Sequence, residues 1–442
     1  MTDGLDRATL RQFLLGLAQG MNASAESVDR IRDVIAEVAR AYGGDDADFV
    51  VLPTIILIES GESDESRVAI RSATNASFRF DQIAALYELI AQAKTGSVTP
   101  LDGIRRLNEI GAMRPRLGWI TRTFGHAVLT TGLSLLLAPT WQGVIVAFVL
   151  GALIGLLKLV RSPTLQLIMP VVAAFVCATA VFLLAEVIEI GDPIRLLIAP
   201  LVTFLPGGVL TSATVELAAG QMISGASRLV YGFVQLALLA FGILAAGTVV
   251  RVDSSSYEAL DGGSPLPWWV ALIGILVFAL GNYLHFSAPP STFGWVLLAL
   301  VVAYTGQWAG TEFVGATVGG FVGAVAMTPV VLWIATLRHG APSQLTFLPA
   351  FWLLVPGAAG LVGLTEAVAT DGGLSDFTTA LVSVMSIALG VLIGTALYRV
   401  VHHGAEEIVQ FAVALPPASD ESAPAPNLWS RITAPWRRNG HR

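Results

Sequence analysis

The stretch LVTFLPGGVLTSATVEL (residues 201–217) combines an apolar run, a Pro-Gly-Gly interruption and a glutamate. A second stretch, FWLLVPGAAGLVGLTEA (351–367), repeats the arrangement, because aligning Pro206 with Pro356 also aligns Glu216 with Glu366 without a gap. A proline inside an apolar helix removes a backbone hydrogen bond, and adjacent glycines permit local unwinding. The two stretches therefore predict a pair of interrupted membrane helices in equivalent positions of an internal repeat.

The composition is typical of an integral membrane protein. Of the 442 residues, 54% are hydrophobic and only 13% are charged, with a formal net charge of −7. The first thirty residues carry charges throughout and have no long apolar core, so we expect no signal peptide and a cytosolic N-terminus. The single cysteine, Cys177, lies in an apolar run, which excludes an intramolecular disulfide and predicts a core residue.

From Phe124 onward the chain has ten apolar segments, each near the length of roughly 20 residues that a bilayer requires. The second five follow the first five at an offset of about 150 residues. Because five is odd, the second copy must enter the membrane from the opposite side, and the bias of Arg and Lys places both termini in the cytosol. We therefore predict a polytopic α-helical membrane protein with about ten transmembrane helices as two five-helix inverted repeats, preceded by a small α+β cytosolic domain. The segments lie near 124–138, 141–159, 165–186, 193–218, 229–250, 268–286, 291–308, 313–336, 346–369 and 379–401.

Four segments with distinct composition define the predicted domains. They are a cytosolic α+β domain (1–118), a first five-helix repeat (119–252), a second five-helix repeat (264–403) and a disordered cytosolic tail (404–442), whose arginine-rich end reads as a positive-inside tail rather than a specific membrane anchor.

The pattern within the first domain predicts four helices and a strand. Apolar residues at helical spacing indicate helices over 5–20, 24–42, 80–94 and 99–111. FVVLPTIILI (49–58) predicts one strand buried on both faces, and ESGESDES (59–66) predicts a solvated turn. That acidic turn has neither the spacing of a calcium loop nor a complete nucleophile elbow, so neither a metal site nor an enzyme is predicted.

Inverted repeats with interrupted helices are the plan of secondary transporters, whose substrate binds where the broken helices meet. Exposed helix N-termini suit a carboxylate, and nearby hydroxyls such as that of Thr203 suit a polar substrate. The predicted substrate-binding residues are Pro206, Gly207, Gly208, Thr211, Ser212, Thr214, Glu216, Pro356, Gly357, Thr365 and Glu366.

Glu216 and Glu366 are also the proton-coupling candidates, because a carboxylate within a span is costly and is a functional hypothesis by default. Each lies ten residues beyond its break, about 15 Å along a straight helix. The alternative for both is therefore an interfacial glutamate that caps a helix, just as the proline breaks could be structural kinks.

Other polar residues of the apolar segments have simpler explanations. Lys158 and Arg161 end a span on the cytosolic side and are read as orientation anchors. His126 and His285 could relay protons, but with no carboxylate beside them in the sequence they are as well explained as packing residues. Nucleic-acid binding is disfavoured, because the first domain is net negative and lacks a basic stripe.

Several stretches together resemble the threonine/serine exporter family of bacteria. They are ESVDRIRDVIAEVARAYG (26–43), VVLPTIILI (50–58), GIRRLNEI (103–110) and the two Pro-Gly stretches, in this order. The resemblance covers most of residues 10–403. It implies a protein of the bacterial inner membrane that exports threonine and serine, driven by protons, without a cofactor. ESGESDES departs from the pattern expected after the Pro-Thr strand, and the tail lies outside the resemblance.

Rival functions stay open at this stage. Similar-looking relatives imply export of small dicarboxylates such as succinate, and the same broken helices would serve a passive channel. A membrane-tethered regulator acting through the first domain is a further alternative. Coupling to protons follows from the carboxylates and from the absence of an ATP-binding motif. The sequence leaves the substrate, the coupling ion and a homo-oligomeric state undecided.

Overall fold

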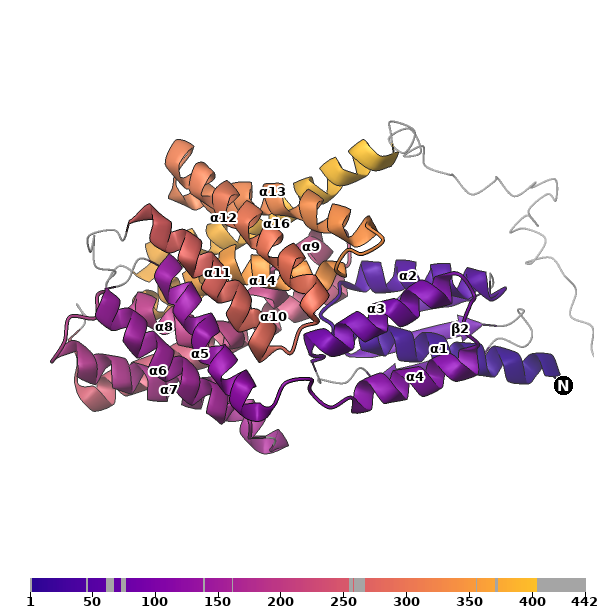
Figure 1. Ribbon diagram of the computed structural model, residues 1–442, viewed down its shortest axis with the longest axis horizontal. Coiled ribbons are helices and arrows are strands. Elements are labelled where there is room, and N and C mark those ends of the chain that lie inside the picture. The colour runs from indigo at the N-terminus through magenta and orange to yellow at the C-terminus, as the bar shows by residue number, and fades with distance from the viewer. Residues whose placement is uncertain are drawn as a thin grey trace, which may run out of the picture. The chain divides into compact units, whose positions relative to one another are not determined.

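A computed structural model gives the fold (Figure 1). It describes residues 2–44, 47–60, 67–72, 77–137, 140–160, 162–253, 257, 267–354, 356–369 and 373–403. The predictions for 404–442 and for most of ESGESDES lie outside the described residues. All contacts reported below lie within the compact unit that ends at Tyr398.

The N-terminal region, residues 2–113, packs the helices over 2–23 and 28–41 against one face of a three-stranded antiparallel sheet of order β1-β2-β3, and two further helices cover these (Figure 1). Its core is formed by apolar side chains of all four helices together with Ile56 and Ile58. The helices agree with the predicted ranges to within a few residues, because amphipathic periodicity is a local signal. The elements are α1 (Thr2–Ala23), α2 (Val28–Ala41), β1 (Asp48–Val51), β2 (Ile55–Ser60), β3 (Arg67–Ser72), α3 (Phe80–Lys94) and α4 (Pro100–Ala112).

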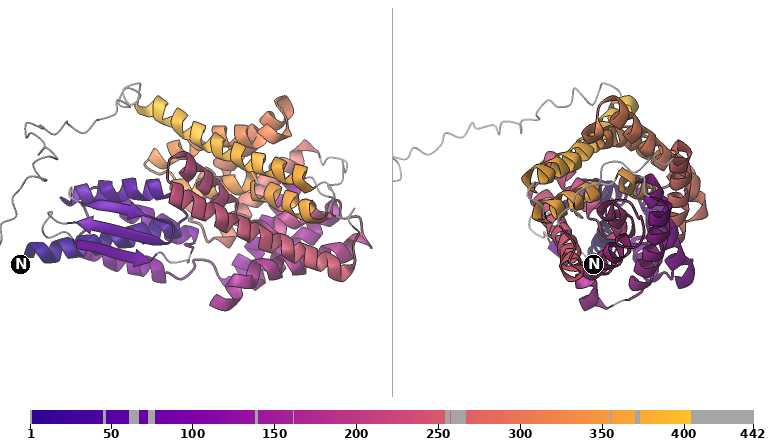
Figure 2. Two further views of the ribbon diagram at one scale, coloured as in Figure 1. Left: turned by 180° about the vertical axis from the view of Figure 1, so that it is seen from behind. Right: turned by 90° about the vertical axis from the view of Figure 1, so that its left-hand side faces the viewer.

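The prediction of a single doubly buried strand over 49–58 is wrong. Pro53 has no N–H to donate to a sheet ladder, and the chain turns back there, so that the N–H of Leu52 donates to the carbonyl of Ile55. The result is a β1–β2 hairpin. Ile56 faces the helices and is fully buried, whereas Ile70 on the opposite face is 67% exposed. The left view of Figure 2 shows this outer face of the sheet turned away from the helices.

The membrane region begins at α5 and is helical over nearly all its described residues. Helices cover the positions of the ten predicted segments, with one helix or two consecutive helices at each. They are α5 (Trp119–Leu136), α6 (Trp141–Leu157), α7 (Pro163–Ala185), α8 (Pro193–Leu201), η1 (Val202–Phe204), α9 (Gly207–Ala218), α10 (Met222–Val250), α11 (Trp268–His285), η3 (Pro290–Thr292), α12 (Phe293–Phe313), α13 (Ala316–Thr336), α14 (Ser343–Leu354), α15 (Pro356–Ala369) and α16 (Gly373–His403).

Not all of these helices are long and apolar enough to cross a bilayer unaided. Among the described residues five helices meet that requirement, or six if the bent pair formed by Pro193–Phe204 and Gly207–Ala218 is one span. Others, such as α6 and α14, are apolar but shorter. The chain is thus a multi-pass membrane protein, and the count of ten spans stays a prediction.

The first helix of each predicted half packs directly on the other along a seam of glycines. A Cβ atom on Gly132 of α5 would lie 2.2 Å from the backbone nitrogen of Phe278, and one on Gly281 of α11 would lie 2.1 Å from that of Leu129. Residue 132 of α5 meets residue 278 of α11, and residue 129 of α5 meets residue 281 of α11, so the two helices run antiparallel. Only glycine permits backbones to approach this closely in a membrane.

A second pair of contacts recurs at the offset predicted for the repeat. A Cβ on Gly242 of α10 would meet the carbonyl oxygen of Val171 and the Cβ of Ala174, both on α7. In the other half, a Cβ on Gly390 of α16 would meet the carbonyl oxygen of Phe321 and the Cβ of Ala324 on α13. Glycines about 150 residues apart thus make equivalent contacts in the two predicted halves; the repeat and its inversion across the membrane stay predictions.

Candidate functional site

The interruption predicted at Pro206 is present. Helix α8 continues as the short η1, Leu205 then adopts an extended backbone, and α9 begins at Gly207. The two arms of the pair bend by 69°. Since Pro206 has no N–H and the ladder stops, backbone groups at the break need partners from other helices.

Side chains from three neighbouring elements supply polar contacts at the break. The Gln235 amide of α10 donates to the carbonyl of Phe204 over 3.0 Å. The Thr203 hydroxyl lies 3.1 Å from Nε2 of His126 on α5. The ammonium of Lys158, at the end of α6, lies 5.0 Å from the centre of the Phe204 ring. The break is therefore a polar site inside an otherwise apolar bundle.

The two membrane histidines lie together beside this break. Their rings are 4.7 Å apart in an edge-to-face arrangement. Nδ1 of His126 lies 2.8 Å from the carbonyl of Gly151, and Nδ1 of His285 lies 3.0 Å from the carbonyl of Arg122. A carbonyl can only accept, so each Nδ1 carries a hydrogen. Nε2 of His126 in its neutral form then accepts the hydrogen bond of Thr203.

The predicted hydroxyl residues of α9 differ in their surroundings. Thr211 is 2% exposed, and its hydroxyl has no hydrogen-bond partner among the described residues. Thr214 donates to the carbonyl of Leu210 one turn earlier, and Ser212 is half-buried. Nothing lies within 4 Å of the position a Cβ would occupy on Gly208. Unfilled space and an unpaired hydroxyl thus occur within the first turns of α9.

Glu216 does not lie at the break but at the far end of α9, against the N-terminal region. Its side chain is fully buried and accepts the backbone N–H of Val28, the first residue of α2, over 3.1 Å. The guanidinium of Arg228 on α10 lies 3.2 Å from its other oxygen. Ser27 makes no side-chain cap to α2, so Glu216 takes over the capping role.

Helices α14, which ends at Leu354, and α15, which begins at Pro356, flank the second predicted interruption; residue 355 between them lies outside the described residues, so this break stays a prediction. Thr365 is fully buried and donates to the carbonyl of Leu361. Glu366 is half-buried and has an interaction partner within the chain. Helix α9 contacts both α14 and α15, so the second arm of the first break touches both helices that flank the second predicted interruption.

The N-terminal region also contacts the second half. Glu26, in the turn before α2, is 4% exposed, and its carboxyl is hydrogen-bonded by Tyr87 of α3 and Gln344 of α14. Burial raises the pKa of the Glu26 carboxyl, against the lowering effect of these hydrogen bonds. Burial and the neighbouring Glu26 carboxyl likewise raise the pKa of Tyr87 well above its usual value. Glu26 and Val28, at the start of α2, therefore contact α14 and α9, one helix in each predicted half.

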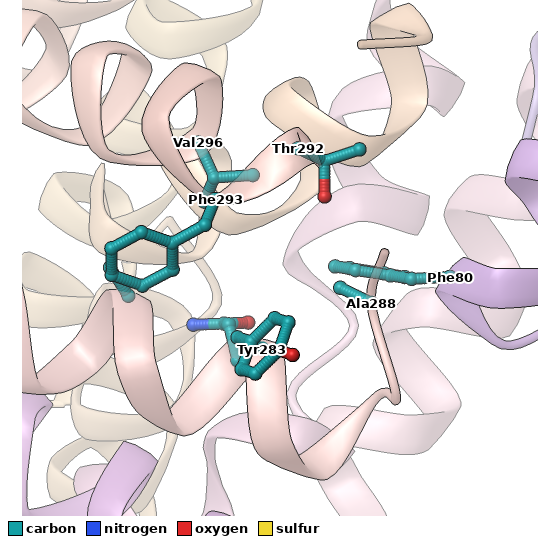
Figure 3. Close-up of a pocket in the computed structure, with 8 residues that line it drawn as sticks. Phe80, Tyr283, Ala288, Thr292, Phe293 and Val296 are labelled. Carbon is teal, nitrogen blue, oxygen red and sulfur yellow. The ribbon is translucent and has the colours of Figure 1, made fainter. Parts of the chain in front are cut away.

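Two cavities accompany this junction. The smaller holds about 10 Å³ and lies between Phe80 of α3 and the helices α11 and α12 (Figure 3). That volume suits a single water molecule. The larger, about 460 Å³, is an open groove between Val28, Arg32 and the α9–α10 corner at Gln221. Gln221 also donates to Asp29 over 2.7 Å, which holds α2 to that corner.

Comparison with known proteins identifies the family of this chain. A family model described as "Putative threonine/serine exporter" matches residues 12–250, more than half of the chain. The chain belongs to this exporter family. The match ends at the last residue of α10 and so takes in the N-terminal region and the first break.

Two curated relatives match the chain with different identity and coverage. It is 26% identical over 433 residues to a "Probable threonine/serine exporter" of Mycobacterium tuberculosis, a match that covers 92% of this chain and 80% of the relative. It is 21% identical over 289 residues to an uncharacterized protein of Schizosaccharomyces pombe, covering 61% of this chain and 34% of the relative. No solved structure matches the chain.

Several polar residues at the break and at the contact with the N-terminal region give no signal in the sequence. Gln235 and Gln344 stand alone in apolar helices, and an uncharged amide gives no charge signal. Arg228 is one of the cations behind the bias of Arg and Lys, and that bias alone does not reveal that it pairs with Glu216. The sequence shows His126 and His285 as polar residues in apolar segments, but the antiparallel seam that joins them cannot be read from their positions in the chain.

Proposed function

We propose that the protein exports small hydroxy amino acids, threonine and serine, from the cytosol across the bacterial inner membrane in exchange for protons. The observation that supports this most is the break at Pro206, where polar side chains of three helices surround an interrupted membrane helix in a member of the exporter family. Both termini would lie in the cytosol, and the N-terminal region would be the cytosolic domain.

In this proposal the two breaks form the translocation site. Alternate exposure would follow from rocking of one half against the other about that site. The residues predicted from the sequence at the first break, Gly207 to Thr214, would contact the substrate, and those from Pro356 to Glu366 would complete the site from the second half. The contact of α9 with α14 and α15 supports this assignment.

Glu216 would couple protons to transport through its contacts with the cytosolic domain. The carboxylate is held by Arg228 and by the N–H of Val28, and both contacts favour the charged form. Protonation would weaken both and loosen α2 from the end of α9. A proton arriving at Glu216 would thereby change how firmly the cytosolic side of the first broken helix is held.

The test is uptake of labelled threonine into inside-out membrane vesicles with and without an imposed proton gradient. We expect gradient-driven accumulation that serine competes and that Glu216→Gln and Glu366→Gln each abolish. Glu312→Gln is the matched control, because Glu312 is an exposed carboxylate at the C-terminal end of α12 and belongs to neither predicted interruption.

Other outcomes separate the rival functions. Competition by succinate rather than serine would indicate a dicarboxylate exporter. Equilibration without accumulation would indicate a passive channel. Absence of any transport, with both glutamine variants behaving as wild type in the cell, would favour a membrane-tethered regulator and contradict the proposal.

A further inference from the structure

We propose that Lys158 binds the carboxylate of the transported amino acid at the first break. This inference rests on the proposed function and adds a ligand that the residue's position at the end of an apolar helix does not reveal. Lys158 is half-buried and contacts the ring of Phe204, the residue that ends η1. That ring lies three residues before α9 begins, so the ammonium belongs to the break itself.

The charge of Lys158 is not neutralised by a carboxylate. It makes no ion pair among the described residues, and the described acids of the broken helix pair are already engaged. Asp192 caps α8 and pairs with Arg195, and Glu216 pairs with Arg228. An unpaired cation in a partly desolvated position is unfavourable by itself, and a bound anion relieves that cost.

The neighbours of Lys158 add no negative charge that would repel a carboxylate. The ammonium of Lys158 acts electrostatically on the rings of His126 and His285. Backbone carbonyls hold both rings as Nδ1–H tautomers. Arg122, the nearest further cation, donates to the carbonyl of His285. A monoanion with a small polar body therefore matches the site better than a cation does.

The start of α9 strengthens the same preference. A helix N-terminus favours negative charge through its free N–H groups. Gly207, Gly208 and Thr211 share one face of α9 by their spacing, with open space at Gly208 and an unpaired buried hydroxyl at Thr211. A zwitterion whose carboxylate meets Lys158 could use this face for its remaining polar groups.

An orientation anchor would require only a positive charge on this side of the membrane. A ligand requires that the charge distinguish substrates with a carboxylate from those without one. The two roles are therefore separated by threoninamide, which retains the ammonium group, the hydroxyl and the side chain of threonine but has no carboxylate.

The experiment measures the KM for threonine and the inhibition constant for threoninamide in inside-out vesicles carrying wild type, Lys158→Gln, Lys158→Arg or Lys94→Gln. Lys94→Gln is the matched control, because Lys94 pairs with Glu37 on the N-terminal region, away from the break. We expect wild type to prefer threonine over threoninamide. Lys158→Gln should raise the KM about tenfold or more and leave the inhibition constant of threoninamide unchanged, and Lys158→Arg should retain the preference.

A second measurement does not depend on transport. The Tm of the purified full-length protein in detergent should rise with threonine but not with threoninamide, and this rise should be lost in Lys158→Gln. Wild-type KM and preference in Lys158→Gln would overturn the role of Lys158 while leaving the exporter intact. Equal weakening of both compounds would assign Lys158 to structure. If threonine neither raised the Tm of the wild-type protein nor was transported by it, both proposals would be overturned.

Discussion

The carboxylate of Glu216 caps a helix that begins 188 residues earlier in the chain, at Val28. A residue of the first broken membrane helix thus completes the N-terminus of α2 in the N-terminal region. Arg228 adds the opposite charge and donates in turn to the backbone carbonyl of Glu26 over 3.3 Å. One buried carboxylate therefore holds three separate segments together.

Removal of this cap should loosen the N-terminal region. Glu216→Ala leaves the charge of Arg228 without its carboxylate and the N–H of Val28 without its acceptor, at a cost of roughly 3–5 kcal/mol for a broken buried pair. Glu216→Gln keeps an acceptor for Val28 and should cost less. Hydrogen exchange of the amide of Val28 and the Tm in detergent measure both effects. If Arg228→Gln restored nothing in the Glu216→Gln background, the ion pair would not be the stabilising contact.

The pH dependence of stability should carry a signature of Glu26. Burial raises its pKa in the folded protein, so folding favours the protonated form. Its stabilising contribution is therefore fully present below the ordinary pKa of the carboxyl and is lost as pH rises through the raised value. The Tm of wild type minus that of Glu26→Gln should accordingly fall as pH rises from about 4.5.

The Glu26 comparison isolates one group, because all other titrating residues are shared by the two proteins. Asp102→Asn, at an exposed surface pair with Arg105, provides a control for the loss of a carboxylate in the same region. A difference in Tm that stayed flat or increased with pH would contradict a raised pKa.

The bond between Thr203 and His126 should matter for the break. Thr203→Val keeps the shape but leaves Nε2 of the buried imidazole without its donor, which should cost about 1–3 kcal/mol. Thr203→Ser should retain most of the stability. The measurement is the Tm in detergent, with Thr214→Val as control, since the Thr214 hydroxyl bonds only within its own helix. An equal loss of Tm in Thr203→Val and Thr214→Val would contradict a stabilising role for the Thr203–His126 hydrogen bond.

The α5–α11 seam should tolerate no side chain. Gly281→Ala places a Cβ 2.1 Å from the backbone nitrogen of Leu129, and backbone must shift to relieve the clash, at a cost of roughly 1–3 kcal/mol or more. Gly294→Ala on α12 meets nothing within 4 Å and serves as the matched control. The yield of folded protein by size-exclusion chromatography and the Tm check this. Tolerance of both changes would contradict the close approach.

Features with a local cause could be predicted from the sequence. Helix α3 occupies the predicted range, and the interruption lies at Pro206, because periodicity and a missing N–H act within one turn. The single strand predicted over 49–58 is wrong for a local reason as well, because Pro53 has no N–H to donate to a sheet ladder and the chain turns back there.

The partners of the candidate site could not be predicted in this way. His126 meets Thr203 across 77 residues, and Glu26 meets Gln344 across more than half the chain. Such pairs depend on which helices pack together and at what depth, and one sequence carries no signal for either. The matched positions of Glu216 and Glu366 were visible, but the cap that Glu216 provides to α2 was not.

The short turn from Ser24 to Val28 is bound on one side to Glu216 and on the other, through Glu26, to Gln344. Any relative movement of the two membrane halves must therefore alter the free energy with which this turn is held. Thermodynamic linkage makes the relation reciprocal. A protein or small molecule that binds the N-terminal region more tightly in one arrangement of the halves would shift the membrane region toward that arrangement, so this turn would let a ligand of the N-terminal region bias the proposed transport cycle.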